Sequence, residues 1–339
     1  MKILVTGAAG FLGRALVERL LAHGEPEVRV SVRAPSQRAQ WQALAARYPA
    51  SRVEVAQVNL TSPDQTARAV EGVDTIYHLA ASLSGAPADM FLNTVVGSKT
   101  LIEAVGSQRP VRIVLVSSFS VYGVAELERG ALVDERTPLE RHPQKRDMYA
   151  QVKLRQELLC RELAASKGID LVVVRPGVVY GPGGVAISSR VGLELFGVFL
   201  LLGGRNILPL SYVENCAEAI VVAGRSPAAA ASVFNIHDDD LPTCREYLAA
   251  YSSQVRRLRS APLPYPALML LSRAVERYHR WSHGQLPAVF TPYKTAASWG
   301  GNRFDNARLK SLGWRQLVST AEGMRRTFAW LKQHGTVEH

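Results

Sequence analysis

Three side chains in two separate stretches of the chain have the types and the spacing that proton transfer requires. Tyr149 and Lys153 stand four residues apart in "MYAQVKL", so a helix would place both on one face. A lysine charge beside a tyrosine lowers the pKa of the phenol from its ordinary value of about 10. Ser118, at the exit of the strand-like run "VLVSSFSVYG", offers a hydroxyl to the same oxygen. Such a trio suits proton exchange with an alcohol or carbonyl oxygen while a hydride moves at the adjacent carbon.

The glycines at the start of the chain indicate a place for a phosphate-bearing cofactor. "MKILVTGAAGFLG" begins with an apolar strand and continues into Gly7, Gly10 and Gly13, after which apolar residues recur at helical spacing. The first glycine permits a tight turn, the second lets the backbone approach a pyrophosphate, and the third lets the helix pack close to the strand. The start of that helix offers free N–H groups to an anion. The alternative is a glycine-rich turn that binds nothing.

Alternating strands and helices predict how these residues are positioned. Strands are expected at 2–5, 28–33, 53–58, 75–79, 111–117 and 171–174, with helices between them. This rhythm predicts parallel βαβ units, and hence an α/β fold with a Rossmann-type doubly wound parallel sheet. We expect a dinucleotide-binding domain over residues 1–182, with returning segments at about 207–237. A smaller, mostly helical substrate-binding region is expected over 183–339.

The composition argues against several other classes of protein. No apolar run reaches the ~18 residues that a membrane span needs, and Met1 leads directly into the first strand, which predicts a chain without a leader. Cys160, Cys216 and Cys244 fit neither a disulfide framework nor a metal site, so we expect a cytoplasmic protein without a metal. The formal net charge is +11, but the basic residues are scattered, which fits a solvated basic face better than a nucleic-acid interface.

Seven motifs follow one another along nearly the whole chain. They are "TGAAGFLG" at 6–13, "YHLAA" at 77–81, "SSFSVYG" at 117–123, "YAQVK" at 149–153, "RPGVVYGPG" at 175–183, "YVENCAEA" at 212–219 and "RFDNARLKSLGW" at 303–314. In this order they resemble the motifs of the extended short-chain dehydrogenases/reductases. That family includes nucleotide-sugar epimerases and dehydratases, 3β-hydroxysteroid dehydrogenases and dihydroflavonol-type reductases. The resemblance implies an NAD(P)-dependent enzyme without specifying one reaction.

The same resemblance implies roles for individual residues. Ser118, Tyr149 and Lys153 take the catalytic positions, and Lys153 also holds the nicotinamide ribose. Helices at 91–105 and 149–165 resemble the pair that forms a four-helix dimer interface in the family, which implies a homodimer. Cofactor contacts are implied for Thr6, Gly7, Ala9, Gly10, Phe11, Leu12, Gly13, Arg33, Asn59, Leu60, Leu79, Ala80, Ala81, Ser117, Tyr149, Lys153, Pro176, Gly177, Val178 and Val179.

The end of the second strand bears on the choice between NAD and NADP. NAD-preferring members carry an acidic residue there, which binds the adenosine ribose. This chain has Val32 followed by Arg33, with Ser36 and Arg38 close behind. Since an arginine pairs with the 2′-phosphate that a carboxylate would repel, NADP(H) is favoured. The alternative is that Arg33 only stacks on adenine and that NAD(H) binds well.

The C-terminal third bears on the substrate. Nucleotide-sugar members carry an Arg-Pro-Gly-Asp sequence before their last motif, whereas this chain lacks it and has Lys294 as the only cation near that place. A diphosphate that leaves water needs fixed cationic partners. Apolar stretches at 191–202 and 265–281 could instead cover an apolar ketone or alcohol, or touch a membrane surface.

We therefore expect an NADP(H)-dependent oxidoreductase that interconverts a ketone and a secondary alcohol on an apolar or amphipathic small molecule. One alternative is a nucleotide-sugar epimerase or dehydratase that uses a tightly bound NAD(P). A second alternative is a non-catalytic NADP-binding regulator. Regulators of this superfamily usually lose the tyrosine or the lysine, whereas Ser118, Tyr149 and Lys153 are all present here, which favours an enzyme.

Overall fold

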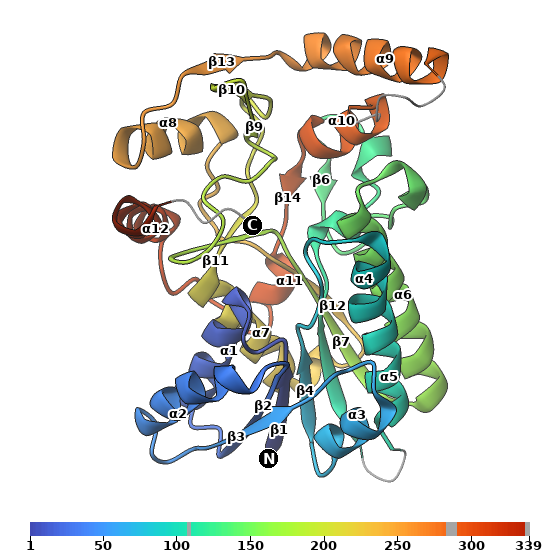
Figure 1. Cartoon of the computed structure of the whole chain (residues 1–339), viewed down its shortest axis with the longest axis vertical. Helices are drawn as coiled ribbons and strands as arrows, with labels where there is room; N and C mark the ends of the chain where they lie inside the picture. The colour runs from blue at the N-terminus through green and yellow to red at the C-terminus, as the bar shows by residue number, and fades with distance from the viewer. Residues whose placement is uncertain (107–109, 283–289, 336–339) are drawn as a thin grey trace.

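The computed structural model describes residues 1–106, 110–282 and 290–335, and a seven-stranded parallel sheet lies at its centre (Figure 1). Its strands are β1 (Lys2–Thr6), β2 (Glu27–Val32), β3 (Arg52–Gln57), β4 (Thr75–His78), β5 (Arg112–Val116), β7 (Asp170–Pro176) and β12 (Val233–Ile236). They lie in the order β12-β7-β5-β4-β1-β2-β3, and every neighbouring pair is parallel. The predicted Rossmann-type sheet is confirmed.

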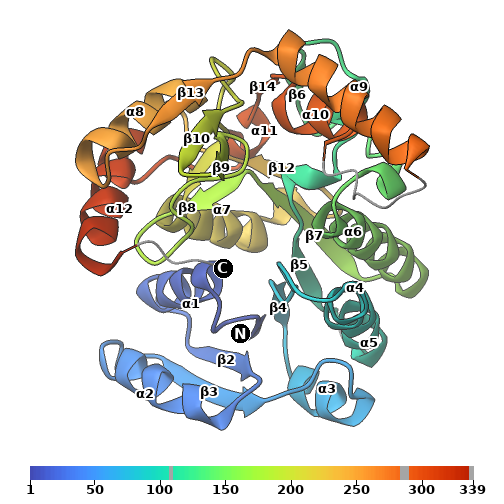
Figure 2. The same ribbon diagram turned by 45° about the horizontal axis from the view of Figure 1, so that its top comes forward.

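Helices cover both faces of the sheet (Figures 1 and 2). On one face lie α1 (Phe11–Ala22), α2 (Arg38–Ala46) and α7 (Val213–Arg225). On the other lie α3 (Pro63–Val70), α5 (Gly97–Ala104) and α6 (Met148–Lys167), with α4 (Pro87–Phe91) and the π-helical turn Leu92–Val96 leading into α5. Successive residues of β1 serve both cores, since Ile3 and Val5 pack on the first face and Leu4 on the second. Burial on both faces explains why the inner strands β1, β5 and β7 are nearly continuous apolar runs, whereas the edge strand β3 alternates and is only partly buried.

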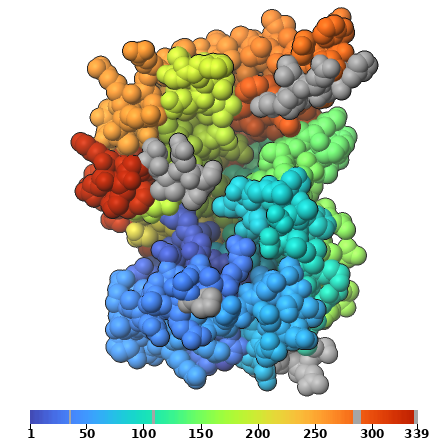
Figure 3. All heavy atoms as spheres, in the orientation of Figure 1, coloured from blue at the N-terminus to red at the C-terminus, as the bar shows by residue number. Residues whose placement is uncertain are grey.

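A second region sits above the carboxyl ends of the strands (Figure 1). It contains a three-stranded sheet of β9 (Gly192–Leu195), β10 (Val198–Leu201) and β13 (Ser260–Pro262), together with a β8 (Val178–Tyr180) and β11 (Leu210–Tyr212) pair. Its helices are α8 (Cys244–Gln254), α9 (Tyr265–Trp281), α10 (Pro292–Trp299) and α12 (Thr320–His334). Figure 3 shows α9 and the β9–β10 hairpin forming the upper surface.

The smaller elements complete the chain. Two short strands pair with each other, β6 (Leu132–Val133) and β14 (Arg303–Phe304), and α11 (Ala307–Lys310) follows β14. Short 3₁₀ helices lie at Pro35–Gln37, Phe119–Val121, Val124–Glu126, Pro143–Lys145 and Pro227–Ala229.

The upper region differs from the expected, mostly helical one through its three-stranded sheet. The apolar run 191–202 forms the β9–β10 hairpin, which turns at Phe196 and Gly197, both with positive φ. A continuous apolar run does not distinguish a strand from a helix by periodicity, so the sequence argument missed this sheet. The domain boundary at residue 182 stays a prediction.

The strand order positions a site at one edge of the sheet. The chain leaves β1 toward β2 on one side, whereas β4 and β5 lie on the other side, so the connections diverge above β1 and β4. Ligands of doubly wound sheets bind at such a point, outside the carboxyl ends of the strands. None of the helices in the described part of the chain combines the length and apolar character that a membrane crossing requires. The described residues also hold no group of three or more metal-ligating side chains, and the expected absence of a metal stays a prediction.

Candidate active site

The first turns of α6 position the tyrosine and the lysine. Asp147 caps this helix, since its carboxylate accepts a hydrogen bond from the Ala150 N–H at 3.0 Å. One helical turn separates Tyr149 from Lys153, so both side chains lie on one face. Both line a cleft of about 570 Å³ above the carboxyl ends of β1, β4 and β5.

Ser117 and Ser118 follow β5 at the same edge of the sheet. Ser118 Oγ accepts a hydrogen bond from the Ser120 N–H at 3.1 Å, which fixes the turn out of the strand. The Ser118 side chain also hydrogen-bonds the Tyr149 side chain and lines the cleft with it. The structure therefore brings Ser118, Tyr149 and Lys153 together on one wall of the cleft, as the sequence pattern predicts.

The protonation of Tyr149 differs from the sequence-based expectation. Burial raises the pKa of Tyr149 above its ordinary value of 10, and the hydrogen bond with Ser118 offsets only part of that rise. The lowering expected from Lys153 is not found, because its ammonium donates to the Val116 carbonyl at 2.7 Å and to Gln156 Oε1 at 2.6 Å. Tyr149 thus keeps its proton at neutral pH, which suits a proton donor.

Lys153 is a cation held in the protein interior by neutral acceptors. Its side chain is buried, and burial lowers its pKa to about 8, although the nearby Cys160 and Glu157 favour the charged form. Two strong hydrogen bonds, to a backbone carbonyl and to Gln156, compensate for part of the lost hydration.

A buried hydrogen-bond network extends from Gln156 back to the first strand. Gln156 Nε2 donates to Ser98 Oγ at 2.8 Å, and the hydroxyls of Ser98 and Thr6 each lie 2.7 Å from a ring nitrogen of His78. Burial, reinforced by the Lys153 charge, lowers the pKa of His78 to about 3, so the ring is neutral. The network joins β1, β4, α5 and α6 to the lysine. In the sequence, His78 stands only within the motif at 77–81, and no pattern singles out Gln156.

A second buried network anchors α6 to β5 and β7. Glu157 accepts a hydrogen bond from Ser117 Oγ at 2.6 Å, and the Arg175 guanidinium binds both of its carboxylate oxygens. Burial raises the pKa of Glu157, but hydrogen bonds and charges of Arg175 and its neighbours outweigh that effect and hold the pKa below its usual value. Arg161 adds an ion pair at 2.8 Å. The helix that carries Tyr149 is therefore fixed in register on the sheet.

The glycine turn has the shape of a pyrophosphate cradle. Gly7 has a φ of +68°, and a Cβ there would lie 2.8 Å from the Ala80 nitrogen, so only glycine fits. A Cβ at Gly13 would lie 2.2 Å from the Gly7 carbonyl oxygen. No side chain caps the start of α1 at Gly10, so the first-turn N–H groups remain available to an anion. These residues fit a dinucleotide cofactor.

The adenosine end of the cleft lies beyond β2 and β3. Arg33 is exposed there and, among the described residues, its guanidinium has no hydrogen-bond or ion-pair partner. Gln37 lines the same end, and its buried Oε1 has no partner in the described chain. The Asn59 side chain accepts hydrogen bonds from the backbone and hydroxyl of Thr61, so its oxygen is used to hold the local turn.

Most of the predicted cofactor contacts converge on the cleft. Those that line it are Gly7, Ala9, Gly10, Phe11, Leu12, Gly13, Arg33, Asn59, Leu60, Leu79, Ala80, Ala81, Ser117, Tyr149, Lys153, Pro176, Gly177 and Val179. Thr6 and Val178 do not line it: Thr6 lies beneath, against His78, and Val178 pairs with Leu210 in the β8–β11 ladder.

Other residues also line the cleft without having been predicted as contacts. They are Ser31, Val32, Gln37, Val58, Thr61, Ser82, Leu83, Asn93, Val116, Gly184 and Val185. Val32, Val58 and Val116 lie at or next to the last residue of a predicted strand, so the sequence could have placed them at the carboxyl edge of the sheet. The loop residues Leu83 and Val185 carried no such signal.

The comparisons with known proteins agree with this geometry. Residues 3–236 match the model of the NAD dependent epimerase/dehydratase family. The chain belongs to this family. It is thus an NAD(P)-dependent oxidoreductase of the extended short-chain dehydrogenase/reductase type.

Curated relatives span most of the chain. It is 26% identical over 350 residues to 3beta-hydroxysteroid-dehydrogenase/decarboxylase isoform 1 of Arabidopsis thaliana, covering 96% of this chain and 78% of that protein. It is also 26% identical to 2-alkyl-3-oxoalkanoate reductase of Shewanella oneidensis, covering 96% and 85% of the two chains. The crystal structure of gox2253 superposes with a TM-score of 0.78 at 23% identity, over 99% of each chain, which confirms the fold.

The buried Lys153 predicts how stability depends on pH. Because its pKa of about 8 in the folded chain lies below the ordinary 10.5, the unfolded chain binds more protons between these values. The contribution of Lys153 to the free energy of unfolding therefore rises as the pH increases from about 8 to 10.5. Lys153→Met removes that contribution, so the variant should be stabilised relative to the wild type most at pH 7 and least at pH 10.

Urea unfolding at pH 7, 8, 9 and 10 measures this difference. Lys167→Met, at an exposed position of the same helix, is the control and should show a pH-independent difference. A Lys153→Met difference that is equally large at pH 7 and pH 10 would contradict the account.

Proposed function

We propose that this protein interconverts a ketone and a secondary alcohol on an apolar or amphipathic small molecule with NADP(H). The observation that carries the proposal is the convergence of Ser118, Tyr149 and Lys153 on the same cleft that the glycine turn lines. When bound there, the nicotinamide would supply or accept the hydride. The residues of the chain would bind and orient the substrate and move the proton.

Tyr149 is the proposed proton donor to the substrate oxygen during reduction. Its raised pKa keeps the phenol protonated, and Ser118 shares a hydrogen bond with it. Both hydroxyls can therefore hydrogen-bond one carbonyl oxygen, where negative charge develops in the transition state. Lys153 is the proposed ribose ligand, and the hydrogen bond from Ser118 stabilises the phenolate left after the proton has moved.

NADP(H) is the proposed cofactor because the end of β2 offers a cation and no carboxylate. Arg33 is exposed at the cleft, and Val32 occupies the place of the acidic residue. A free guanidinium can bind a 2′-phosphate bidentately.

An apolar substrate is supported by the upper region. Val185 of this region lines the cleft together with Leu83, which follows β4, and the two side chains are 48% and 71% exposed, so they offer apolar surface to a ligand. By their names, the two relatives given above act on a hydroxysteroid and on an alkyl-substituted oxoalkanoate, both rich in hydrocarbon. An apolar ligand gains roughly 25 cal/mol for each Å² that it buries.

A homodimer through α4, α5 and α6 is also proposed. Phe91 of α4, Leu92 of the turn that leads into α5 and Leu158 of α6 are large apolar side chains, and each is more than 40% exposed. Burying them against a second copy would remove that surface from water.

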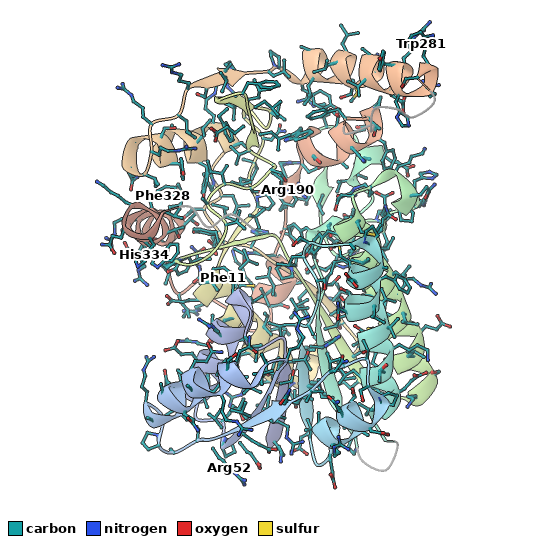
Figure 4. All side chains as sticks on the ribbon, viewed as in Figure 1. Phe11, Arg52, Arg190, Trp281, Phe328 and His334 are labelled. Atoms are coloured by element: carbon teal, nitrogen blue, oxygen red, sulfur yellow. The ribbon has the colours of Figure 1, made fainter. Side chains whose placement is uncertain are left out.

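We also propose peripheral contact with a membrane surface, as the sequence suggested, and α9 is the element that supports it. Leu270 and Trp281 are 68% and 75% exposed on this helix, beside the exposed Arg273 and Arg277. Figure 4 shows Trp281 at the outer end of α9. An apolar stripe bordered by arginines suits the surface of an anionic bilayer.

Loss of the phenol tests the catalytic assignment. Tyr149→Phe should lower turnover of an accepted ketone by at least about 10²-fold, since it removes the proton donor, while the affinity for NADPH stays unchanged. Lys153→Ala should lower both the turnover and the affinity for NADPH. Stopped-flow NADPH oxidation and fluorescence titration measure the two quantities, with the exposed Tyr278→Phe as control. Near-normal turnover by Tyr149→Phe would refute the mechanism.

A charge reversal tests the cofactor assignment. Arg33→Asp should weaken NADPH binding by about 10- to 100-fold and make NADH the tighter ligand, because the carboxylate repels the 2′-phosphate. The control is Arg52→Asp, at the amino end of β3 and far from the cleft (Figure 4). Equal affinities of the wild type for NADPH and NADH, unchanged in Arg33→Asp, would contradict the proposal.

Calorimetry tests the substrate class. UDP, GDP and dTDP should show no micromolar binding, whereas NADPH should be consumed with a panel of apolar ketones. Micromolar binding of one diphosphate, competitive with the accepted ketone, would favour the epimerase or dehydratase alternative instead.

A further inference from the structure

Arg190 lies just before β9, and its backbone is held in place by two helices of the upper region. The Arg190 carbonyl accepts a hydrogen bond from Cys244 Sγ of α8 at 3.5 Å. The adjacent Ser189 carbonyl accepts one from Trp299 Nε1 of α10 at 3.1 Å. A Cβ at Gly203 would lie 2.5 Å from the Arg190 carbonyl oxygen, so this contact requires glycine there. The position of Arg190 is thus built into the fold.

Among the buried and half-buried arginines of the described residues, the Arg190 side chain stands out because it has no acceptor. Seven arginines of the described chain are buried or half-buried, and six of them pair with a carboxylate. The six pairs are Arg19 with Glu218, Arg29 with Glu54, Arg112 with Asp170, Arg146 with Glu140, and both Arg161 and Arg175 with Glu157. An unpaired, half-buried guanidinium has lost hydration without gaining a partner.

Arg190 does not line the cleft itself, but its charged neighbours place it close to the start of α6. Burial and the positive charge of Arg146 lower the pKa of Arg190, whereas Cys244 and Asp147 act in the opposite direction without outweighing them. Arg146 and Asp147 directly precede α6, whose first turn carries Tyr149. Figure 4 shows Arg190 in the middle of the molecule, between the upper region and the sheet. Its guanidinium stays charged, since arginine is not deprotonated in proteins.

We propose that Arg190 binds a carboxylate of the substrate, on the side of the cleft that faces the upper region. The inference deepens the proposed function, on which it rests, because it makes the substrate an apolar oxo or hydroxy acid. One guanidinium matches one carboxylate with two parallel hydrogen bonds. A diphosphate would need a second cation, and Arg146 is already engaged with Glu140 at 2.9 Å and with the Tyr122 carbonyl.

Binding of a matched acid and ester tests this site without any need for turnover. Calorimetry in saturating NADP⁺ would compare 3-hydroxydecanoate with its methyl ester. The wild type should bind the acid more tightly. Arg190→Met should weaken acid binding by about 10- to 100-fold and leave ester binding unchanged, and Arg190→Lys should lie between. Arg205→Met, at an exposed arginine after β10, is the matched control and should change neither.

Three results would overturn the proposal. The first is a wild type that binds acid and ester equally, or an Arg190→Met variant that binds the acid as the wild type does. The second is Arg190-dependent binding of UDP, which would make the anion a diphosphate. The third is a loss of ester binding together with a lowered melting temperature in Arg190→Met, which would indicate a structural role. Removal of an unpaired cation should instead leave the melting temperature unchanged or raise it.

A failure of the proposed ketone reduction can be distinguished from a failure of the carboxylate site. NADPH oxidation with 3-oxodecanoate tests the chemistry separately from binding. Arg190-dependent binding of 3-hydroxydecanoate without any NADPH oxidation would support the carboxylate site and refute the ketone reduction.

Discussion

A lysine ammonium held in the protein interior is the interaction on which the rest of the candidate site depends. Lys153 leaves water for two neutral acceptors, the Val116 carbonyl and Gln156, and its pKa falls to about 8 as a result. Such a charge is tolerated where hydrogen bonds or an opposite charge compensate for the lost hydration. The network of the neutral His78 and the Glu157–Arg175 ion pair hold α6 on the sheet, which keeps the acceptors of Lys153 in place, and Glu157 favours the charged lysine. The same burial keeps Tyr149 protonated.

Arg33 and Arg190 differ from the paired arginines of the described chain, and this difference points to a role in ligand binding. The buried and half-buried arginines of the described chain are paired with carboxylates, apart from Arg190. Arg33, at the adenosine end of the cleft, also has no partner among the described residues. Two unpaired cations, Arg33 and Arg190, are the arrangement expected when the cofactor carries one anionic group and the substrate carries another. The wall between them is hydroxylic and apolar, which suits a carbonyl group and hydrocarbon.

Short-range patterns in the sequence were sufficient to predict the sheet and one wall of the site. The glycines from Gly7 to Gly13 and the Tyr149–Lys153 spacing each act within one turn or one helix, so their geometry follows from local rules. Gln156 lies three residues after Lys153 on the same helix, so local spacing allows that contact. The Val116 carbonyl comes from β5, and the Ser98 and His78 partners of Gln156 come from α5 and β4, which no local spacing encodes. The β9–β10 hairpin was missed because an apolar run fits either a strand or a helix. The importance of Arg190 lies in the absence of a partner, which only the fold reveals.

Transfer of a labelled hydrogen tests the central claim most directly. The protein would be mixed with NADPH that carries deuterium at both C4 positions of the nicotinamide and with an accepted apolar ketone, and the products would be analysed by mass spectrometry. The account predicts one deuterium on the carbinol carbon of the released alcohol, with an equal amount of NADP⁺, and loss of both in Tyr149→Phe. Unlabelled product, or a cofactor that returns unchanged while the substrate is epimerised, would contradict it.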